Sequence, residues 1–370
     1  AYDFDGARRR YPQIELVYWV GGNPFHHHQD LNRLRRALRR PDTVVVHEPY
    51  WTPMARHADV VFPATITLER NDIATGRGDD FVIAMQQALP PYGEARNDHD
   101  IFAGLADRLG MGADFREGRD TDGWLRHLWD RWTERLSAAG LAAPTFDEFW
   151  AAGQMPLDSS DDDRVYLADF RADPDRHPLR TPSGRIELYS ADIASFGYDD
   201  CPPHPAWLEP VEWSGGARAE KWPLLLVANN PATRLHSQLD PGGYSAASKV
   251  QGREPIRMHP ADAATRGIAE GAVVVVHNDR GSLLAGARLT EAVRPGVVQL
   301  STGAWYDPDD PGADRPRCVH GNPNVLTADV GTSRLAQACS GQHTLVEVTR
   351  HDGPVPPIRA HDPPNLVTRP

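Results

Sequence analysis

The first 115 residues alternate short apolar runs with helix-type patterns, and this alternation constrains the fold more than any other feature. Three runs have strand length, namely Ile14–Val20, the β-branched run Asp42–Glu48, and Ala58–Ala64 with its interrupting proline. A leucine-spaced helix pattern follows the first run, and residues 100–110 read as a helix ended by glycine. Strands that alternate with helices indicate a doubly wound parallel sheet, so residues 1–115 are predicted to form part of an α/β domain.

The pattern changes near Trp222 to short strands joined by turns. Residues 271–290 predict a hairpin that turns at Asn278–Gly281, and further strands are expected on either side of it. One short helix is expected just before the hairpin, in residues 259–268. Many short strands with one small helix are typical of a compact β-barrel, which we place at residues 216–350.

Two further parts complete the predicted organisation. Residues 116–215 are expected to form an irregular, partly helical connection that contains an amphipathic helix around Trp129 and a solvated acidic loop at Asp158–Arg164. The Pro-rich residues 351–370 are expected to form an extended tail.

Charge and cysteine content exclude several functional classes. The chain has 51 acidic and 39 basic residues and a net charge of −12, which argues against general nucleic-acid binding and requires any anionic ligand to be held by local donors. The three cysteines are widely separated, which argues against a disulfide framework, an iron–sulfur cluster and a cysteine zinc site. No apolar run is long enough to predict a transmembrane segment. The start at Ala1 lacks a signal-peptide pattern, so we expect a processed or partial chain, with periplasmic and cytoplasmic locations both open.

The turn after the first apolar run has the chemistry of a ligand cradle. Gly21 and Gly22 allow close approach to the backbone and tolerate positive φ, and Asn23 is placed to cap the following helix. The start of that helix offers unpaired N–H groups and the positive end of its dipole, which suit a phosphate or an electron-rich ring. A tight strand-to-helix turn without a ligand is the alternative.

Three consecutive histidines follow this turn. Because consecutive helical residues fan out around the axis by roughly 100° each, His26, His27 and His28 cannot all bind one ion, and no metal site is predicted here. One histidine that donates to a ligand fits better. His47 and Glu48 follow the second run and are expected at the same edge of the sheet.

Other polar residues are candidates for recognising a nucleobase. Arg70 and Asp100 lie in polar segments of the α/β part, and a carboxylate can accept hydrogen bonds from both the N1–H and the amino group of guanine. Taken singly, each also fits an ion pair or a helix cap.

Two loops of the predicted barrel are rich in amides, hydroxyls and imidazoles. The first spans Ala228–Gln238 and the second spans His320–Gln342. Such groups match the mixed donor and acceptor edges of pterin and guanine rings. No G-x-S-x-G, P-loop or H-E-x-x-H motif is present, so no catalytic residue is predicted.

Taken together, these segments resemble the dimethyl sulfoxide reductase family of molybdopterin oxidoreductases. The motifs YWVGGNPFHHHQDLNRL, HEPYWTPMARHADVVFPATITLERND, TPSGRIELYS, NNPATRLHSQ and HGNPNVLTADVGTSRLAQACSGQ occur in family order along nearly the whole chain, and are most similar to the biotin sulfoxide and trimethylamine N-oxide reductase branch. The resemblance implies a C-terminal double-psi β-barrel and a bis(molybdopterin guanine dinucleotide) molybdenum cofactor. It also implies two-electron reduction of an S-oxide or N-oxide at molybdenum, with water as a product.

The resemblance further implies which residues hold the cofactor. One pterin or its phosphates would contact the glycine turn and the histidines that follow it. The guanosine end would contact polar residues further along the α/β part, and loops of the barrel would supply the remaining contacts. These residues are Gly21, Gly22, Asn23 and His27 or His28; then His47, Glu48, Arg70 and Asp100; then Asn229, Asn230, Arg234, His236, Gln238, Asn324 and Gln342. The implied partners are a small-molecule S-oxide or N-oxide and an electron-donor protein or reductant.

One family feature has no counterpart in this sequence. The molybdenum ligand of the family is a serine in the N-terminal half, and Ser183 and Ser237 stand in other motifs. We therefore expect a C-terminal portion of a larger enzyme that does not turn over alone. The alternatives are a stand-alone molybdopterin-nucleotide binding module and an interaction protein built on the barrel. The cofactor hypothesis requires the loops around Asn23 and Asn230 to face a shared gap.

Overall fold

The chain folds into two compact units in the computed structural model. The structure describes residues 1–76, 79–138, 140, 142–157, 165–338 and 344–365. Unit 1 comprises residues 1–46, 51–60 and 187–370, and unit 2 comprises residues 47–50 and 61–186. Unit 2 is thus inserted into unit 1, which is assembled from segments far apart in the sequence.

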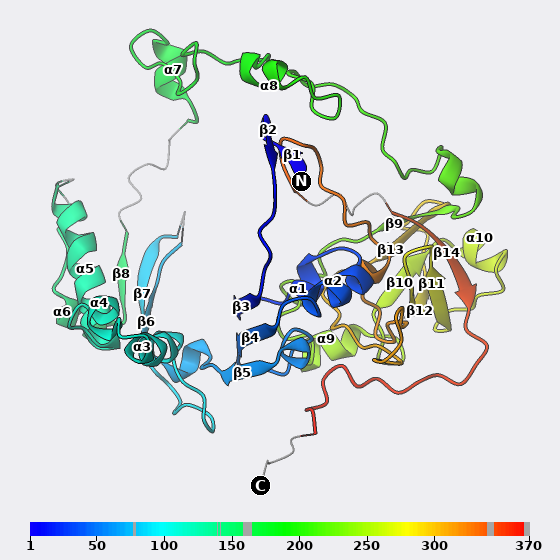
Figure 1. Ribbon diagram of the computed structural model, residues 1–370, viewed down its shortest axis with the longest axis horizontal. Coiled ribbons are helices and arrows are strands. Elements are labelled where there is room, and N and C mark those ends of the chain that lie inside the picture. The colour runs from blue at the N-terminus through cyan, green and yellow to red at the C-terminus, as the bar shows by residue number, and fades with distance from the viewer. Residues whose placement is uncertain (77–78, 139, 141, 158–164, 339–343, 366–370) are drawn as a thin grey trace. The chain divides into compact units, whose positions relative to one another are not determined.

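Unit 1 contains a closed six-stranded barrel, drawn at the right of Figure 1. Around the barrel the strand order is β10-β12-β11-β14-β9-β13. The strands are β9 (Leu224–Val227), β10 (Pro255–Met258), β11 (Val273–His277), β12 (Ser282–Leu289), β13 (Val297–Leu300) and β14 (Thr344–Arg350). The pairs β10/β12 and β9/β13 are parallel, and the other four are antiparallel. This mixed barrel after an α/β region confirms the predicted fold class.

The hairpin of β11 and β12 shows how local sequence builds the barrel. Val274 and Val276 face Ala285 and Leu283 across the pair, and all four side chains are fully buried. Gly286 is required by close packing, because a Cβ there would lie 2.3 Å from the Cβ of Val250. The predicted hairpin and its turn are confirmed, as is the short helix α10 (Pro260–Ala264) before it.

The α/β region contributes a small sheet, β3-β4-β5. Its strands are β3 (Leu16–Val20), β4 (Thr43–Glu48) and β5 (Val60–Pro63), close to the predicted runs. Helices α1 (Pro24–His27) and α2 (Leu31–Leu38) follow β3, and both contact the barrel-loop 3-10 helix η4 (Pro323–Val325). The connection from β4 to β5 holds only a 3-10 helix, η1 (Ala55–His57), in place of an α-helix.

The turn before α1 has the expected backbone but not the expected cap. Gly21 and Gly22 have φ values of 71° and 78°, where glycine is favoured. Asn23 occupies the N-cap position of α1, yet its side chain makes no capping hydrogen bond. Its Nδ2 donates to Ser237 Oγ at 3.4 Å, while its Oδ1, the atom that would cap the helix, makes no hydrogen bond to the described residues, so the capping prediction is wrong.

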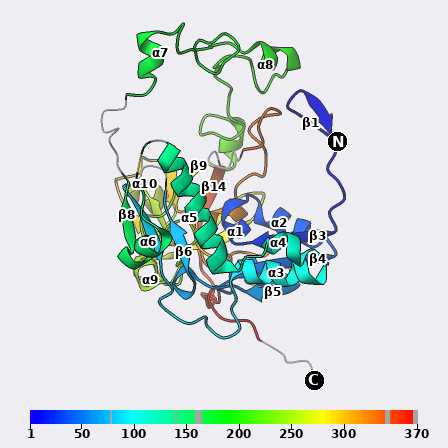
Figure 2. The same cartoon turned by 90° about the vertical axis from the view of Figure 1, so that its left-hand side faces the viewer.

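Unit 2 combines a small antiparallel sheet with helices. The sheet β6-β7-β8 consists of β6 (Asp72–Ala74), β7 (Phe81–Met85) and β8 (Gln154–Pro156), and was not predicted from the sequence. The helices are α3 (Asp98–Arg108), α4 (Gly112–Arg116), α5 (Thr121–Ala138), α6 (Phe146–Ala152) and α7 (Ala168–Ala172). Figure 2 shows α5 as the long helix of this unit.

The predicted amphipathic helix is confirmed as α5. Its Trp129 is 2% exposed and stacks on Phe149 of α6, with ring centroids 3.8 Å apart. Val82 and Ala84 of β7 complete this core cluster. The predicted acidic loop at residues 158–164 lies outside the described residues.

Several short elements complete the chain. They are β1 (Tyr2–Phe4), β2 (Ala7–Arg9), η2 (Thr67–Glu69), α8 (Ala191–Phe196), η3 (Ala217–Glu220) and α9 (Gly243–Ser248). Residues 351–365 contain neither helix nor strand. Within the described ranges, no helix has the length and apolar character needed to cross a membrane.

Candidate functional site

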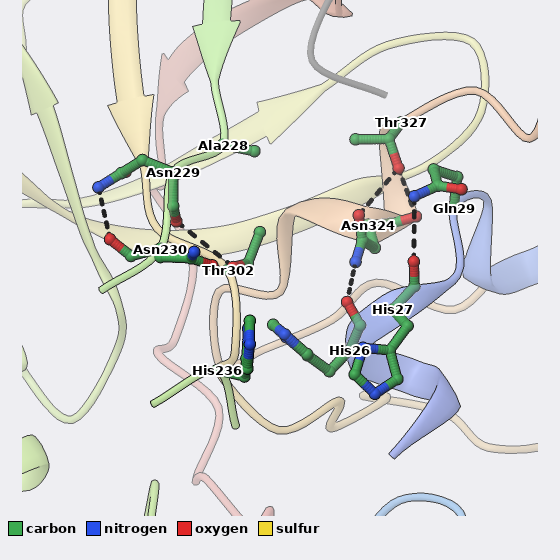
Figure 3. Close-up of a pocket in the computed structure, with 10 residues that line it drawn as sticks. All are labelled: His26, His27, Gln29, Ala228, Asn229, Asn230, His236, Thr302, Asn324 and Thr327. Atoms are coloured by element: carbon green, nitrogen blue, oxygen red, sulfur yellow. Dashed lines mark hydrogen bonds between the residues drawn. The ribbon is translucent and has the colours of Figure 1, made fainter. Parts of the chain in front are cut away.

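A cavity of about 370 Å³ lies in unit 1, where the segment after β3 meets loops of the barrel. Its wall combines imidazoles, amides and hydroxyls from four segments (Figure 3). The lining residues are His26, His27, Gln29, Ala228, Asn229, Asn230, His236, Thr302, Asn324 and Thr327. The segment after Asn23 and the loop of Asn230 therefore open onto one cavity, so the required shared gap is present.

Side-chain amides of the second barrel loop hold the histidine segment in place. Asn324 Nδ2 donates to the carbonyl oxygen of His26 at 2.6 Å, and Asn322 Nδ2 donates to that of Phe25 at 2.9 Å. Thr327 Oγ1 donates to Asn324 Oδ1 at 3.0 Å and fixes the orientation of that amide. The asparagines of the HGNPN motif thus position the backbone that carries the histidines.

Three imidazole rings gather at the cavity. The ring centroid of His26 lies 4.8 Å from that of His27 and 5.1 Å from that of His236, and Figure 3 shows these rings near one another. Burial, reinforced by His27, His236 and Arg234, lowers the pKa of His26 to about 4. Burial also lowers the pKa of His27. At neutral pH, His26 is therefore a neutral ring that can donate or accept a hydrogen bond.

Two buried polar atoms near the cavity make no hydrogen bond to the described part of the chain. They are His26 Nδ1 and Asn23 Oδ1, on side chains of residues that are each 6% exposed. Buried polar groups of this kind are normally satisfied, and an unmatched one indicates a missing partner such as a ligand or water.

The barrel side of the cavity is built by close backbone packing. Thr302 N donates to the carbonyl oxygen of Asn229 at 2.9 Å, which joins the loops after β13 and β9. Gly303 has a φ of 94°, and a Cβ there would lie 1.9 Å from the carbonyl oxygen of His236. Only glycine allows this approach, so Gly303 sets where His236 stands.

A buried charge network lies behind this wall. Asp240 and Glu254 are opposed by Arg234 and Lys249: the Asp240–Arg234 and Asp240–Lys249 distances are 3.4 and 2.7 Å, and those from Glu254 are 3.0 and 2.9 Å. The side chain of Arg234 is 1% exposed. The structure therefore places the guanidinium of Arg234 inside the protein, where it holds the loop, and not on the cavity wall.

Asp240, His320 and His361 are close enough to suggest a metal site, because one ligand atom from each lies within 4.8 Å of the others. Their hydrogen bonds favour a different interpretation. His320 Nδ1 lies 2.9 Å from the carbonyl oxygen of Trp305, so this nitrogen is the donor and is not available to a metal. The ammonium of Lys249 already neutralises Asp240.

The remaining α/β candidates belong to unit 2. His47 is buried, and its Nδ1 lies 2.8 Å from Asp98 Oδ1. Glu48 is also buried, at 8% exposure. Arg70 Nη1 donates to the carbonyl oxygen of Thr65 at 3.1 Å. Asp100 Oδ1 lies 3.5 Å from His99 Nδ1, and its side chain is largely exposed.

The cavity unites only part of the predicted set. His27, Asn229, Asn230, His236 and Asn324 line it. Gly21, Gly22, Asn23, His28, Arg234 and Gln238 stand in the same loops without lining it, and Gln342 lies outside the described residues. The ring of His28 instead meets Trp19 edge-on, with centroids 6.2 Å apart.

Sequence reasoning missed five lining residues, namely His26, Gln29, Ala228, Thr302 and Thr327. The sequence did carry one usable signal. Ala228 and Thr302 each follow a barrel strand closely, as the predicted residue Asn229 does. Thr327 stands three residues after Asn324, within the same polar loop.

Comparison with known proteins identifies the two halves of this arrangement. Residues 7–108 match the family described as Molybdopterin oxidoreductase, and residues 224–345 match the Molydopterin dinucleotide binding domain. The second match spans all barrel strands up to the first residues of β14. All four segments that line the cavity therefore fall within the two matched regions.

Several curated proteins are similar over nearly the whole chain. A dimethyl sulfoxide/trimethylamine N-oxide reductase of Rhodobacter capsulatus is 49% identical over 95% of this chain and 43% of its own length. A biotin sulfoxide reductase of Cereibacter sphaeroides is 49% identical over 95% of this chain and 47% of its own length. A trimethylamine-N-oxide reductase of Haemophilus influenzae is 43% identical, over 98% and 45%. The chain thus spans less than half the length of these relatives.

A solved structure shares the fold. Acetylene hydratase from Pelobacter acetylenicus superposes with a TM-score of 0.69 at 22% identity, covering 94% of this chain and 45% of that one. This likeness supports the architecture alone. The matched regions and the relatives show that the chain carries a molybdopterin oxidoreductase region at residues 7–108 and, in its barrel, a molybdopterin dinucleotide-binding domain.

Proposed function

We propose that this chain is the cofactor-holding portion of a molybdenum enzyme that reduces an S-oxide or N-oxide, such as biotin sulfoxide, trimethylamine N-oxide or dimethyl sulfoxide. Its cofactor is the bis(molybdopterin guanine dinucleotide) form of molybdenum. The observation that carries the proposal is the cavity, whose described lining offers imidazoles, amides and hydroxyls from both matched regions and no carboxylate. Such a wall suits a ligand with phosphates and mixed donor–acceptor rings.

The residues present fit this group. His26 lines the cavity and its unmatched Nδ1 needs a partner, which a ring N–H group or ring nitrogen of a pterin or guanine would supply. With a net charge of −12 the chain as a whole repels phosphate, so a wall without carboxylates is required where phosphate binds. A cavity of about 370 Å³ suits one end of an elongated dinucleotide.

When bound, the cofactor supplies two-electron oxygen-atom transfer. Breaking one S–O or N–O bond with two electrons and two protons releases one water, so a reductant or electron-donor protein is required. The residues of this chain bind and orient. Asn230 and His236 offer polar groups to the ligand, while Asn324 fixes the segment of His26. We further propose that His47, Glu48, Arg70 and Asp100 hold a guanosine end.

Cofactor content tests this proposal directly. The chain is purified from a host that makes the molybdenum cofactor, hydrolysed in acid, and assayed for released GMP and for molybdenum. We expect two GMP per molybdenum, and none from a host strain that lacks molybdopterin synthesis. In parallel, calorimetry with GDP as the probe is expected to show binding to the cofactor-free chain. Absence of GMP together with absence of GDP binding would contradict the proposal.

If GMP is bound, an activity assay distinguishes an enzyme from a binding module. Reduction of a sulfoxide by the full-length protein that contains this chain, with a viologen as reductant, is expected for the enzyme. Bound GMP without any sulfoxide or N-oxide reduction by that full-length protein would support a binding module instead.

A further inference from the structure

The C-terminal tail (residues 351–365) is fixed to unit 1 although it contains no helix or strand. Arg253 Nη2 donates to the carbonyl oxygen of Pro356 at 2.5 Å. The backbone N–H of Arg359 donates to Asp307 Oδ2 at 2.6 Å. Contacts that tie backbone to charged side chains are too specific for a loose terminus.

His361 continues this attachment into the protein interior. Its Nε2 lies 3.0 Å from Asp240 Oδ2, and the preceding Ala360 is fully buried. The ring of His361 also packs edge-on against Trp305 and His320, with centroids 5.2 and 5.1 Å away. The end of the tail thus meets the buried charge network behind the cavity.

Asp240 depends on its donors because it is fully buried. Burial alone would raise the pKa of Asp240, but the hydrogen bond from His361 and the charge of Lys249 hold it well below its usual range. Asp240 is therefore ionised, and the tail supplies one of its hydrogen bonds. Removing that donor leaves a buried charge less satisfied.

Two paths lead from Asp240 to the cavity wall. On the first, Asp240 pairs with Arg234 at 3.4 Å, and Arg234 Nη2 donates to the carbonyl oxygen of Thr302 at 2.9 Å. On the second, Trp305 N donates to Asp240 Oδ2 at 3.1 Å, and Trp305 Nε1 donates to the carbonyl oxygen of Ser237 at 2.9 Å. Thr302 lines the cavity, and Ser237 is the neighbour of the lining residue His236.

We propose that His361 is a positioning residue for the barrel side of the cavity, acting through Asp240 on Thr302 and on the loop of His236. The tail is then a strap that completes the site. The positioning itself is a property of this chain alone, and only the identity of the ligand rests on the proposed function.

The test compares three variants of the full chain by amide hydrogen exchange with mass spectrometry. His361→Leu removes the donor at similar bulk, His361→Gln keeps a side-chain N–H, and His351→Leu is the matched control. His351 stands on the same tail, but its Nε2 lies 3.1 Å from the carbonyl oxygen of Pro354, three residues away, and reaches no buried charge in the described part of the chain. We expect H361L to speed exchange about tenfold in residues 234–240 and 301–306. H361Q is expected to restore most of the protection, and H351L to leave it unchanged.

The barrel hairpin serves as an internal reference for folding. If H361L also speeds exchange in β11 and β12, that variant is generally unfolded. The comparison is then made between H361Q and the wild type, because H361Q keeps the donor. Wild-type protection in H361L would overturn the proposal. Equal effects of H361L and H351L, or of H361L and H361Q, would do so too.

GDP binding separates this inference from the proposed function. If the site binds nucleotide, H361L is expected to weaken GDP about tenfold while H351L matches the wild type. Local loosening in H361L without GDP binding by any variant would leave the positioning role standing and count against the proposed function. GDP binding that is unaffected by H361L would support the proposed function and count against the positioning role of His361.

Discussion

The side-chain amide of Asn324 donates to the carbonyl oxygen of His26 at 2.6 Å, and so joins two segments almost 300 residues apart in the sequence. Both residues line the same cavity. Asn324 is thus a structural brace as well as part of the wall.

Replacing Asn324 with alanine tests this dual role. The change leaves the buried carbonyl of His26 without its donor, so we expect a loss of about 1–3 kcal/mol in the free energy of unfolding. GDP affinity should fall as well. Asn230→Ala is the control: Asn230 is an exposed lining residue whose contact to Asn229 uses its carbonyl oxygen, which the variant keeps. It should weaken GDP binding with little effect on urea denaturation. Equal stability losses in both variants would contradict the brace.

Two exposed histidines offer a matched test of the cavity. His236 lines it, whereas His28 points to Trp19. We expect His236→Ala to remove one or two hydrogen bonds to GDP and so to lower the GDP affinity about 3- to 30-fold, measured by calorimetry. His28→Ala should stay within about twofold of the wild type. A larger loss of affinity in His28→Ala than in His236→Ala would show that the ligand binds beside His28 and not in this cavity.

Gly303 should not tolerate a side chain. A Cβ at this position would lie 1.9 Å from the carbonyl oxygen of His236, and φ is 94°. We expect Gly303→Ala to lower the melting temperature by an amount equivalent to more than about 2 kcal/mol. Gly243, at the start of α9, has no positive φ, and a Cβ added there would meet no atom within 4 Å, so Gly243→Ala is expected to be neutral. Similar melting temperatures for the two variants would refute the close packing.

Breaking the buried network should be far more costly than breaking a surface pair. Arg234→Met leaves Asp240 and Glu254 short of a buried partner, and we expect a loss of about 3–5 kcal/mol in unfolding free energy. Arg350 pairs with Asp352 at 2.6 Å on the surface of the same unit. Arg350→Met should cost at most about 1 kcal/mol. Denaturant titrations of both variants provide the comparison.

Acid should destabilise the protein through His26. Burial lowers the pKa of His26 to about 4, while an unfolded histidine titrates near 6.5. The unfolded chain therefore binds more protons between these values, so the stability contributed by neutral His26 is lost as the pH falls below 6.5 and levels off below about 4. Between pH 7 and pH 5 this amounts to on the order of 2 kcal/mol. Burial also lowers the pKa values of His57 and His320, which add to the same loss, so His26→Asn should make the pH dependence of urea unfolding less steep in that window without abolishing it. An unchanged slope would contradict this assignment.

Sequence patterns predicted the elements that carry strong local signals. The hairpin of β11 and β12 has a β-branched run and a polar turn, and α5 has an apolar stripe, so both were found. The sheet β6-β7-β8 was missed because two of its strands have only three residues, too few to show a period of two.

Tertiary contacts decide the features of the site that the sequence leaves open. The sequence treats His26, His27 and His28 alike, and only the fold of α1 turns His26 into the cavity and His28 toward Trp19. The sequence predicts that Arg234 contacts the cofactor, and the structure shows that its guanidinium also pairs with the buried Asp240 and Glu254. Asn23 occupies a cap position, but its Nδ2 donates to Ser237 Oγ and its Oδ1 does not cap the helix. Such competition between partners is decided only once the chain is folded.

The place of β14 in the barrel has a consequence for biosynthesis. This last strand pairs with both β9 and β11, so the ring of strands stays open until residues 344–350 have emerged from the ribosome. The histidine segment is translated some 300 residues earlier and must wait for its asparagine braces. All ten residues that line the cavity precede β14, so a chain truncated before residue 344 would carry the whole lining but could not close the barrel that supports it.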